Sequence, residues 1–148
     1  MSRSSWLEIT YSSTNTTPYQ LLTILLDAGW NLNDFGDITF IPLGEVECFE
    51  WERLPYNAAN MGVVLALLQA KEQAQEPLGV ALQWQDTHCG GLGFFRHDGT
   101  IAFSASINRR TIPDLMDVTD VHWYLYNLLK PLMDYGITIE YIEWTDHV

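Results

Sequence analysis

The sequence predicts a single α+β domain in which a largely antiparallel sheet, with a central β-meander, packs against about three helices. Residues 78–108 contain three successive stretches in which apolar and polar residues alternate, which is typical of half-buried strands joined by short turns. Three other stretches repeat apolar residues every three or four positions, as amphipathic helices do. The chain has 148 residues, 47% of them hydrophobic, which suits one domain with its own core, and we assign residues 1–148 to it.

The turn in the middle of the meander decides which residues are buried. Asp98-Gly99 favours a two-residue type I′ turn, because Asp and Gly tolerate the positive φ angles that this turn needs. Such a turn aligns Phe94 with Phe103 and directs both to the apolar face, whereas Phe95 is left on the opposite face. We therefore expect Phe103 to belong to the core and Phe95 to be partly open.

The N-terminal part of the chain predicts a strand followed by a well-capped helix. Residues 6–11 alternate as a short strand does. Thr17 provides an N-cap, Pro18 occupies the first helical position, where its missing N–H costs nothing, and Gln20 completes a capping box. Gly29 is a natural C-terminal cap for this helix.

The next segment contains one predicted strand and one stretch with two interpretations. Residues 38–43 predict a strand, and Pro42 places it at a sheet edge or at a strand end. Residues 45–52 fit either a strand with a β-bulge near Cys48 or a plain loop. The bulged strand would bring four carboxylates to one side, namely those of Glu45, Glu47, Glu50 and Glu52.

The rest of the chain predicts two more helices and a last strand. Asn57 can cap a second helix, and either Thr119 or Asp120 can cap a third. Residues 108–118, which precede the third helix, predict turns. Residues 137–144 alternate as a final strand does.

The charge balance excludes several classes of partner. The chain has 19 acidic residues against 7 lysines and arginines, a formal net charge of −12. Phosphate backbones and anionic membrane surfaces would repel such a surface, so we expect neither nucleic-acid nor membrane binding.

The longest apolar stretch, residues 61–68, is too short to span a bilayer, and residues 1–5 are not followed by an apolar signal segment. We therefore expect a cytoplasmic protein in which Cys48 and Cys89 are reduced.

The residues that could carry chemistry do not form a known motif. His88, Cys89 and His97 do not have the ligand spacing of a zinc site. Cys89 could be a nucleophile with His88, His97 or His122 as its base, but sequence adjacency does not supply the geometry that this needs. The nearby glycines lack the Gly-Lys-Ser/Thr ending of a phosphate-binding loop. We expect no metal, no cofactor and no catalytic residue, and a small hydrolase that uses Cys89 or a histidine remains an alternative.

Acidic residues form two clusters, one before Arg53 and one near the C-terminus, where they alternate with aromatic residues. Aromatic rings serve as anchors in protein interfaces, and carboxylates steer a basic partner toward them. The competing interpretation is that the rings belong to the core and that the acids lie on the solvated sides of the strands. We expect the partner-binding surface to include Asp34, Asp37, Glu45, Glu47, Glu50, Glu52, Tyr141, Glu143 and Trp144.

In its general character, the chain resembles bacterial immunity proteins, which neutralise toxins delivered between competing cells. The likeness lies in the small size, the acidity, the expected α+β fold and the lack of catalytic motifs. It implies a cytoplasmic protein, not an enzyme, that binds one basic toxin domain, often a nuclease. The acids would then occupy, or lie beside, the toxin surface that binds nucleic acid. The alternative is an acidic secretion chaperone or adaptor for an effector protein.

Overall fold

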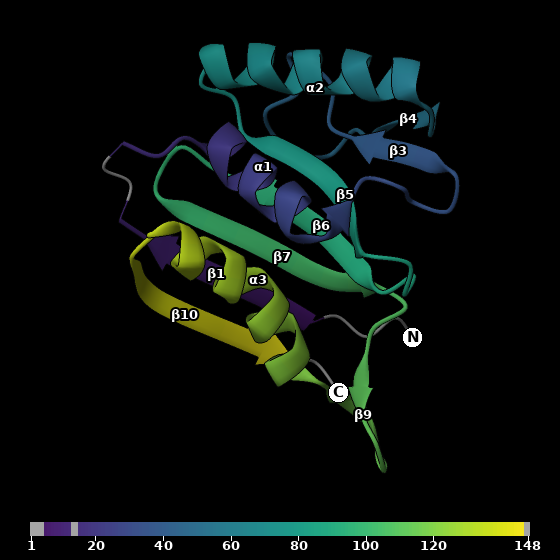
Figure 1. The fold of residues 1–148 in the computed structure, drawn as a ribbon, viewed down its shortest axis with the longest axis vertical. Coiled ribbons are helices and arrows are strands. Elements are labelled where there is room, and N and C mark those ends of the chain that lie inside the picture. The colour runs from purple at the N-terminus through teal and green to yellow at the C-terminus, as the bar shows by residue number, and fades with distance from the viewer. Residues whose placement is uncertain (1–4, 13–14, 147–148) are drawn as a thin grey trace.

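The computed structural model describes residues 5–12 and 15–146, and these residues form three helices and ten strands (Figure 1). The helices are α1 (Pro18–Ala28), α2 (Ala58–Gln73) and α3 (Val121–Tyr135). The strands are β1 (Ser5–Tyr11), β2 (Trp30–Asn31), β3 (Asp37–Phe40), β4 (Glu52–Pro55), β5 (Leu78–Trp84), β6 (Gly90–Phe95), β7 (Thr100–Ile107), β8 (Thr111–Ile112), β9 (Leu115–Thr119) and β10 (Ile139–Asp146).

Eight of these strands form one sheet in which every neighbouring pair is antiparallel. The strand order along the sheet is β10-β1-β7-β6-β5-β3-β4, and β2 also pairs with β5. β8 and β9 form a separate hairpin, although the sequence predicts only turns there. The predicted meander β5-β6-β7 occupies the middle of the sheet, which confirms the largely antiparallel α+β domain.

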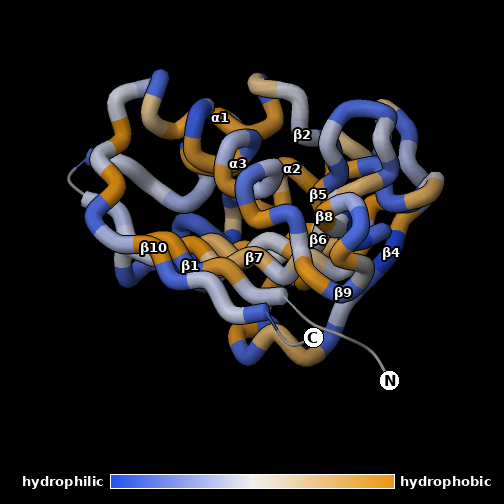
Figure 2. The backbone as a smooth tube through the Cα atoms, turned by 90° about the horizontal axis from the view of Figure 1, so that it is seen from below, coloured by the Kyte–Doolittle hydropathy of each residue, from blue (hydrophilic) through white to orange (hydrophobic). Residues whose placement is uncertain are grey.

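The three helices lie on one face of the sheet and cover the hydrophobic core (Figure 2). α1 packs against α2 and α3, and α2 also contacts β3 and β5. Alternate strand residues point toward the helices and are fully buried, such as Leu7 and Ile9 of β1 and Phe103 of β7. Among the described residues, no helix covers the opposite face of the sheet, which we call the open face. None of the described helices has both the length and the apolar character needed to cross a bilayer.

The capping signals in the sequence predict the helix ends correctly. The Thr17 hydroxyl accepts the Gln20 N–H at 3.2 Å, and the Gln20 side chain accepts the Thr17 N–H at 3.0 Å, which confirms the capping box. Asn57 and Asp120 are the N-caps of α2 and α3, and Gly29 is the C-cap of α1. These signals depend on neighbours within one helical turn, so the fold does not alter them.

The expected two-residue turn between β6 and β7 is wrong. The Arg96 N–H donates to the Thr100 carbonyl at 3.2 Å, so the turn contains the three residues 97–99. Of these three, only Gly99 has a positive φ angle, of 85°. This is the three-residue hairpin loop that ends in a left-handed residue.

The additional turn residue shifts β6 by one position relative to β7. Phe95 faces Ile101 and is 1% exposed, whereas Phe94 faces Ala102 on the open face and is half-buried. A one-residue shift exchanges the faces of all side chains in a strand, so the expected positions of Phe94 and Phe95 are reversed. Phe103 is 1% exposed, so its assignment to the core is confirmed.

The plain-loop interpretation of the acidic stretch is correct, and the bulged strand is wrong. Residues 42–51 have no strand structure, β3 ends at Phe40, and β4 begins only at Glu52. Pro42 follows β3 directly after Ile41 and has no N–H to donate to a neighbouring strand. We call residues 42–51 the acidic loop.

The reversed positions of the two phenylalanines give the first prediction. Phe95→Ala should lower the free energy of unfolding by about 3–5 kcal/mol, because it leaves a cavity in the core. Phe94→Ala should cost clearly less, since Phe94 is half-buried on the open face. Urea unfolding of both variants measures the difference. A larger loss of unfolding free energy for Phe94→Ala would support the two-residue turn and contradict the three-residue turn.

The second prediction concerns the turn itself. Gly99→Val should destabilise the fold by about 1–3 kcal/mol, because a β-branched residue resists a positive φ angle. Gly99→Asn is the matched control, since Asn tolerates the left-handed region and should lose less. Thermal melts of both variants test this, and identical melting temperatures would contradict a strained left-handed position at Gly99.

Candidate protein-binding surface

A buried lysine fixes the acidic loop to the end of α2. Lys71 lies in the last turn of α2, and its side chain is completely buried. Its Nζ donates to the carbonyl oxygens of Pro42 at 2.8 Å and Glu45 at 2.9 Å, and to the carboxylate of Glu76 at 2.9 Å. An ammonium group has three N–H donors, so all three are used. The first half of the loop is therefore held by a charged group that has no access to water.

Glu76 completes this anchor. The same Oε1 that binds Lys71 also accepts the backbone N–H of Gly44 at 2.9 Å. The hydrogen bond from Lys71 lowers the pKa of Glu76 below its usual range, and the bond from Gly44 adds to this effect. Since a lowered pKa favours the carboxylate, the ion pair with Lys71 persists at neutral pH.

The outer part of the loop exposes large apolar side chains beside its carboxylates. Leu43 is 52% exposed, Val46 54% and Phe49 80%. Phe49 is the most exposed of them, and exposed Glu47 and Glu50 lie close to it in the sequence. A ring of this size on a fixed loop gains free energy when a partner covers it, and nearby carboxylates attract basic partners.

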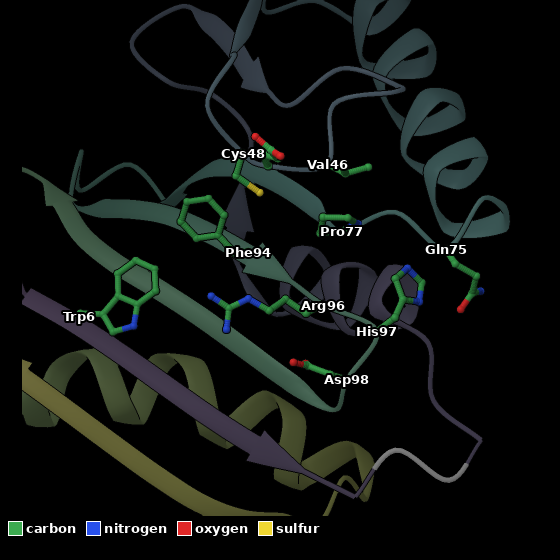
Figure 3. A pocket seen from close by; sticks show the side chains of 10 residues that line it. Trp6, Val46, Cys48, Gln75, Pro77, Phe94, Arg96, His97 and Asp98 are labelled. Atoms are coloured by element: carbon green, nitrogen blue, oxygen red, sulfur yellow. The ribbon is translucent and has the colours of Figure 1, made fainter.

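A groove of about 630 Å³ separates the acidic loop from the open face of the sheet (Figure 3). Val46 and Cys48 line its loop side, Trp6 of β1 lies on the far side, and Phe94 of β6 lies between Cys48 and Trp6. The Phe94 ring is 5.8 Å from Trp6 and 5.7 Å from Trp51 of the loop, centre to centre. These contacts form a row of three aromatic rings across the open face.

Arg96 and His97, which line the groove, already have partners within the chain. Arg96 donates to Glu8 at 2.9 Å on the open face. A ring nitrogen of His97 lies 2.8 Å from the Glu76 carbonyl, and its other ring nitrogen lies 3.5 Å from the Glu72 carboxylate. These contacts hold both side chains in place, so they help to give the groove its shape.

The basic residues are largely neutralised by the chain itself. Seven lysines and arginines are present, and six of them lie in the described residues because Arg3 does not. Five of the six form ion pairs, namely Lys71–Glu76, Arg96–Glu8, Arg109–Asp146, Arg110–Asp120 and Lys130–Asp134. In the described part of the chain, the exposed acids therefore have few cations near them, and the surface potential is negative.

The six acids expected in the first cluster do not all reach the surface to the same extent. Three are exposed, namely Glu47, Glu50 and Glu52. Glu45 is half-buried, and its carboxylate accepts the Glu47 N–H at 2.8 Å. Asp34 and Asp37 bridge each other through backbone hydrogen bonds, and the Asp34 carboxylate accepts the Thr39 hydroxyl at 2.7 Å. These two aspartates shape the turn into β3.

The second cluster lies on β10, at one edge of the sheet. A bulge after Ile139 places Tyr141, which is 59% exposed, and Glu143 on the open face. Trp144 instead faces Leu7 on the helix side, where its ring lies 6.0 Å from that of Tyr124. The open face and the groove therefore lie between the two acidic clusters, and Trp144 belongs to the side of the core.

The described histidines and cysteines come from four segments of the chain, at residues 48, 88–89, 97 and 122. No group of three or more His, Cys, Asp or Glu in the described ranges has the arrangement of a metal site. His88 stacks on Phe35 at 5.5 Å, and both Cys48 and Cys89 are half-buried free thiols. The glycines of β6 allow close strand packing, because a Cβ at Gly91 would collide with the carbonyl oxygen of a β7 residue.

Two residues that matter most for this surface, Lys71 and Phe49, are not among those that the sequence predicts to bind a partner. A signal for Lys71 exists, since it follows Val64 by seven residues and Leu68 by three, which is the spacing of a buried helix stripe. Both apolar residues are fully buried. No comparable signal marks Phe49, because an apolar residue between carboxylates fits a loop and a strand equally well.

The anchor gives the third prediction. Lys71→Met should lower the free energy of unfolding by about 3–5 kcal/mol, because it leaves the Glu76 carboxylate and two carbonyl groups without their hydrogen-bond donor. Cleavage within the acidic loop during limited proteolysis should become faster. Lys130→Met is the matched control, since its ion pair with Asp134 is also 2.9 Å long but lies at the surface. Equal melting temperatures for the two variants would contradict the anchoring role.

No protein-family model, curated protein or solved structure matches this chain. The functional proposal therefore depends on the residues of the chain and their geometry.

Proposed function

We propose that the protein is an immunity protein that binds and blocks a cognate basic toxin domain, such as a nuclease, in the cytoplasm. The single observation that carries this proposal is Phe49, an 80% exposed ring between exposed carboxylates on a loop whose first half a buried lysine fixes. The protein acts by occupying the toxin surface and not by catalysis.

The arrangement supports tight binding for two physical reasons. Because Lys71 fixes the first half of the acidic loop, less conformational entropy is lost when a partner binds the loop. Phe49 offers an anchor that becomes desolvated on docking, whereas Glu47 and Glu50 increase the rate of encounter with a positively charged surface.

The acidity also favours a particular class of toxin. A nuclease needs a positively charged cleft to bind the phosphates of its substrate. A carboxylate-rich loop with a central aromatic ring is complementary to the walls of such a cleft. Binding there, or beside the cleft, would exclude the nucleic acid by charge and by volume.

The direct test is co-expression with the product of the adjacent gene. If that product stops growth when expressed alone, this protein should restore growth and should form a one-to-one complex with it. A harmless product, or persistent growth arrest in the presence of this protein, would reject the proposal.

The fourth prediction separates steering from fold stability. The double reversal Glu47→Lys and Glu50→Lys should slow association with the toxin domain and weaken binding about tenfold or more. The reversal of exposed Asp27 and Asp86 is the control, since it changes the net charge equally at positions far from the loop in the sequence. Association kinetics at two salt concentrations, beside thermal melts, measure both effects. Similar binding by the two variants would place the interface elsewhere.

The anchor is tested by a second pair of variants. Phe49→Ser should speed dissociation without lowering the melting temperature, because the side chain is 80% exposed. Tyr135→Ser removes a ring that is 66% exposed at the end of α3, and it should leave dissociation unchanged. Equal dissociation rates for these variants would show that Phe49 is not an anchor.

A further inference from the structure

The two edges of the large sheet differ in how they are protected. The strand β4 forms one edge and has only four residues. One of them is Pro55, which has no N–H to donate to a neighbouring strand. β10 ends the other edge with eight residues, contains neither proline nor lysine, and pairs only with β1 among the described strands. Short edges and prolines are common devices against unwanted strand pairing, and β10 has neither.

The free edge of β10 is regular over its last six residues. The bulge lies next to Glu140, and from Tyr141 to Asp146 each residue has a partner in β1 in an unbroken register. Tyr141 is 59% exposed on the open face, and its neighbour Ile142 is 39% exposed on the helix side. Both sides of this edge are therefore accessible, as a strand that accepts a neighbour requires.

The end of this segment is held firmly. The two carboxylate oxygens of Asp146 accept the hydroxyl and the backbone N–H of Thr119, each at 2.8 Å. The Ser5 hydroxyl also donates to Asp146, and Arg109 lies 3.9 Å from it. This network fixes the end of β10, and the pairing with β1 keeps residues 141–146 extended, so an added strand would not have to order them.

The charges on β10 select the kind of strand that can pair with it. The strand contains three acids, Glu140, Glu143 and Asp146, and no basic residue. Glu143 also lies directly opposite Glu8 of β1, so the two carboxylates repel each other. Glu8 is neutralised by Arg96 at 2.9 Å, whereas Glu143 has no ion pair within the described residues. A second copy of β10 would add further like charges, whereas a basic strand would supply the missing cation.

We propose that the free edge of β10 is a docking site for an extended, basic segment of the partner protein, which adds a strand to the sheet beside Tyr141–Asp146. The main-chain hydrogen bonds of the added strand supply affinity, and a lysine or arginine opposite Glu143 supplies selectivity. The inference depends on the proposed function only for the basic character of the partner.

The test uses a synthetic peptide, so it does not require the toxin. The probe is a blocked heptapeptide of alternating lysine and valine, and the control is the same peptide with every peptide nitrogen methylated. Both peptides carry the same charge, but the methylated one cannot donate main-chain hydrogen bonds. The probe should slow amide hydrogen exchange selectively at residues 141–146, and the control should bind at least tenfold more weakly.

Two proline variants isolate the outward hydrogen bonds. Along an antiparallel strand, successive N–H groups point alternately to the two neighbours. Of Ile142→Pro and Glu143→Pro, one therefore removes a bond to β1 and the other an outward N–H. The variant that keeps the native melting temperature has lost an outward N–H, so it should no longer bind the probe. Glu143→Lys leaves the backbone intact and should weaken binding of the probe at least tenfold. This variant provides the test if neither proline variant folds.

Three results would overturn the proposal. They are equal binding of the probe and its methylated control, protection that maps to the acidic loop in place of β10, and undiminished binding by the Glu143→Lys variant. Growth rescue gives an independent result. If rescue fails while the probe binds at β10, the toxin-neutralising role is wrong and the docking edge stands. If growth is rescued but the probe does not bind at β10, the docking edge is wrong and the toxin-neutralising role stands.

Discussion

The buried ammonium of Lys71 is the interaction on which the binding surface depends. A charge without water costs several kcal/mol unless its donors are all satisfied. Lys71 meets this requirement with Glu76 and with two carbonyl groups of the acidic loop. If the first half of the loop moved away, the charge would remain buried without these partners, so this half has one strongly preferred position. The loop continues from there along one side of the groove to the exposed ring of Phe49.

The one-sided helix layer determines where a partner can bind. All three helices pack on the same face of the sheet, and the open face is left to side chains and to the acidic loop. The aromatic row of Trp6, Phe94 and Trp51 covers part of this face, and the carboxylates lie at its two margins. Apolar surface in the middle with charge around it is the usual anatomy of a protein interface.

The edges of the sheet add a second constraint. An antiparallel sheet that does not close into a barrel always has two free edges, and each can pair with another chain. In this protein Pro55 lies in the short strand at one edge, whereas the other edge is long, regular and acidic. Acidic residues there disfavour pairing between two copies and favour pairing with a basic strand. One strand can therefore contribute to both solubility and partner choice.

The sequence alone determined the features that depend on near neighbours. The capping box at Thr17, the caps at Asn57 and Asp120 and the strands of the meander follow from residues within about one turn or one strand. The net charge and the lack of a metal motif are likewise sequence properties, and they set the expected class of partner.

Only the tertiary structure decided which side chains face the core and which face a partner. One additional turn residue, fixed by the left-handed Gly99, exchanged Phe94 and Phe95, and a bulge at Glu140 moved Tyr141 to the face opposite Ile139. Lys71 became an anchor because the loop that supplies its acceptors, 26 and 29 residues away in sequence, folds against the end of α2. The physical reason is the same in each case: a strand's period of two makes its faces sensitive to a single residue, and the burial of a charge depends on acceptors that only the folded chain brings together.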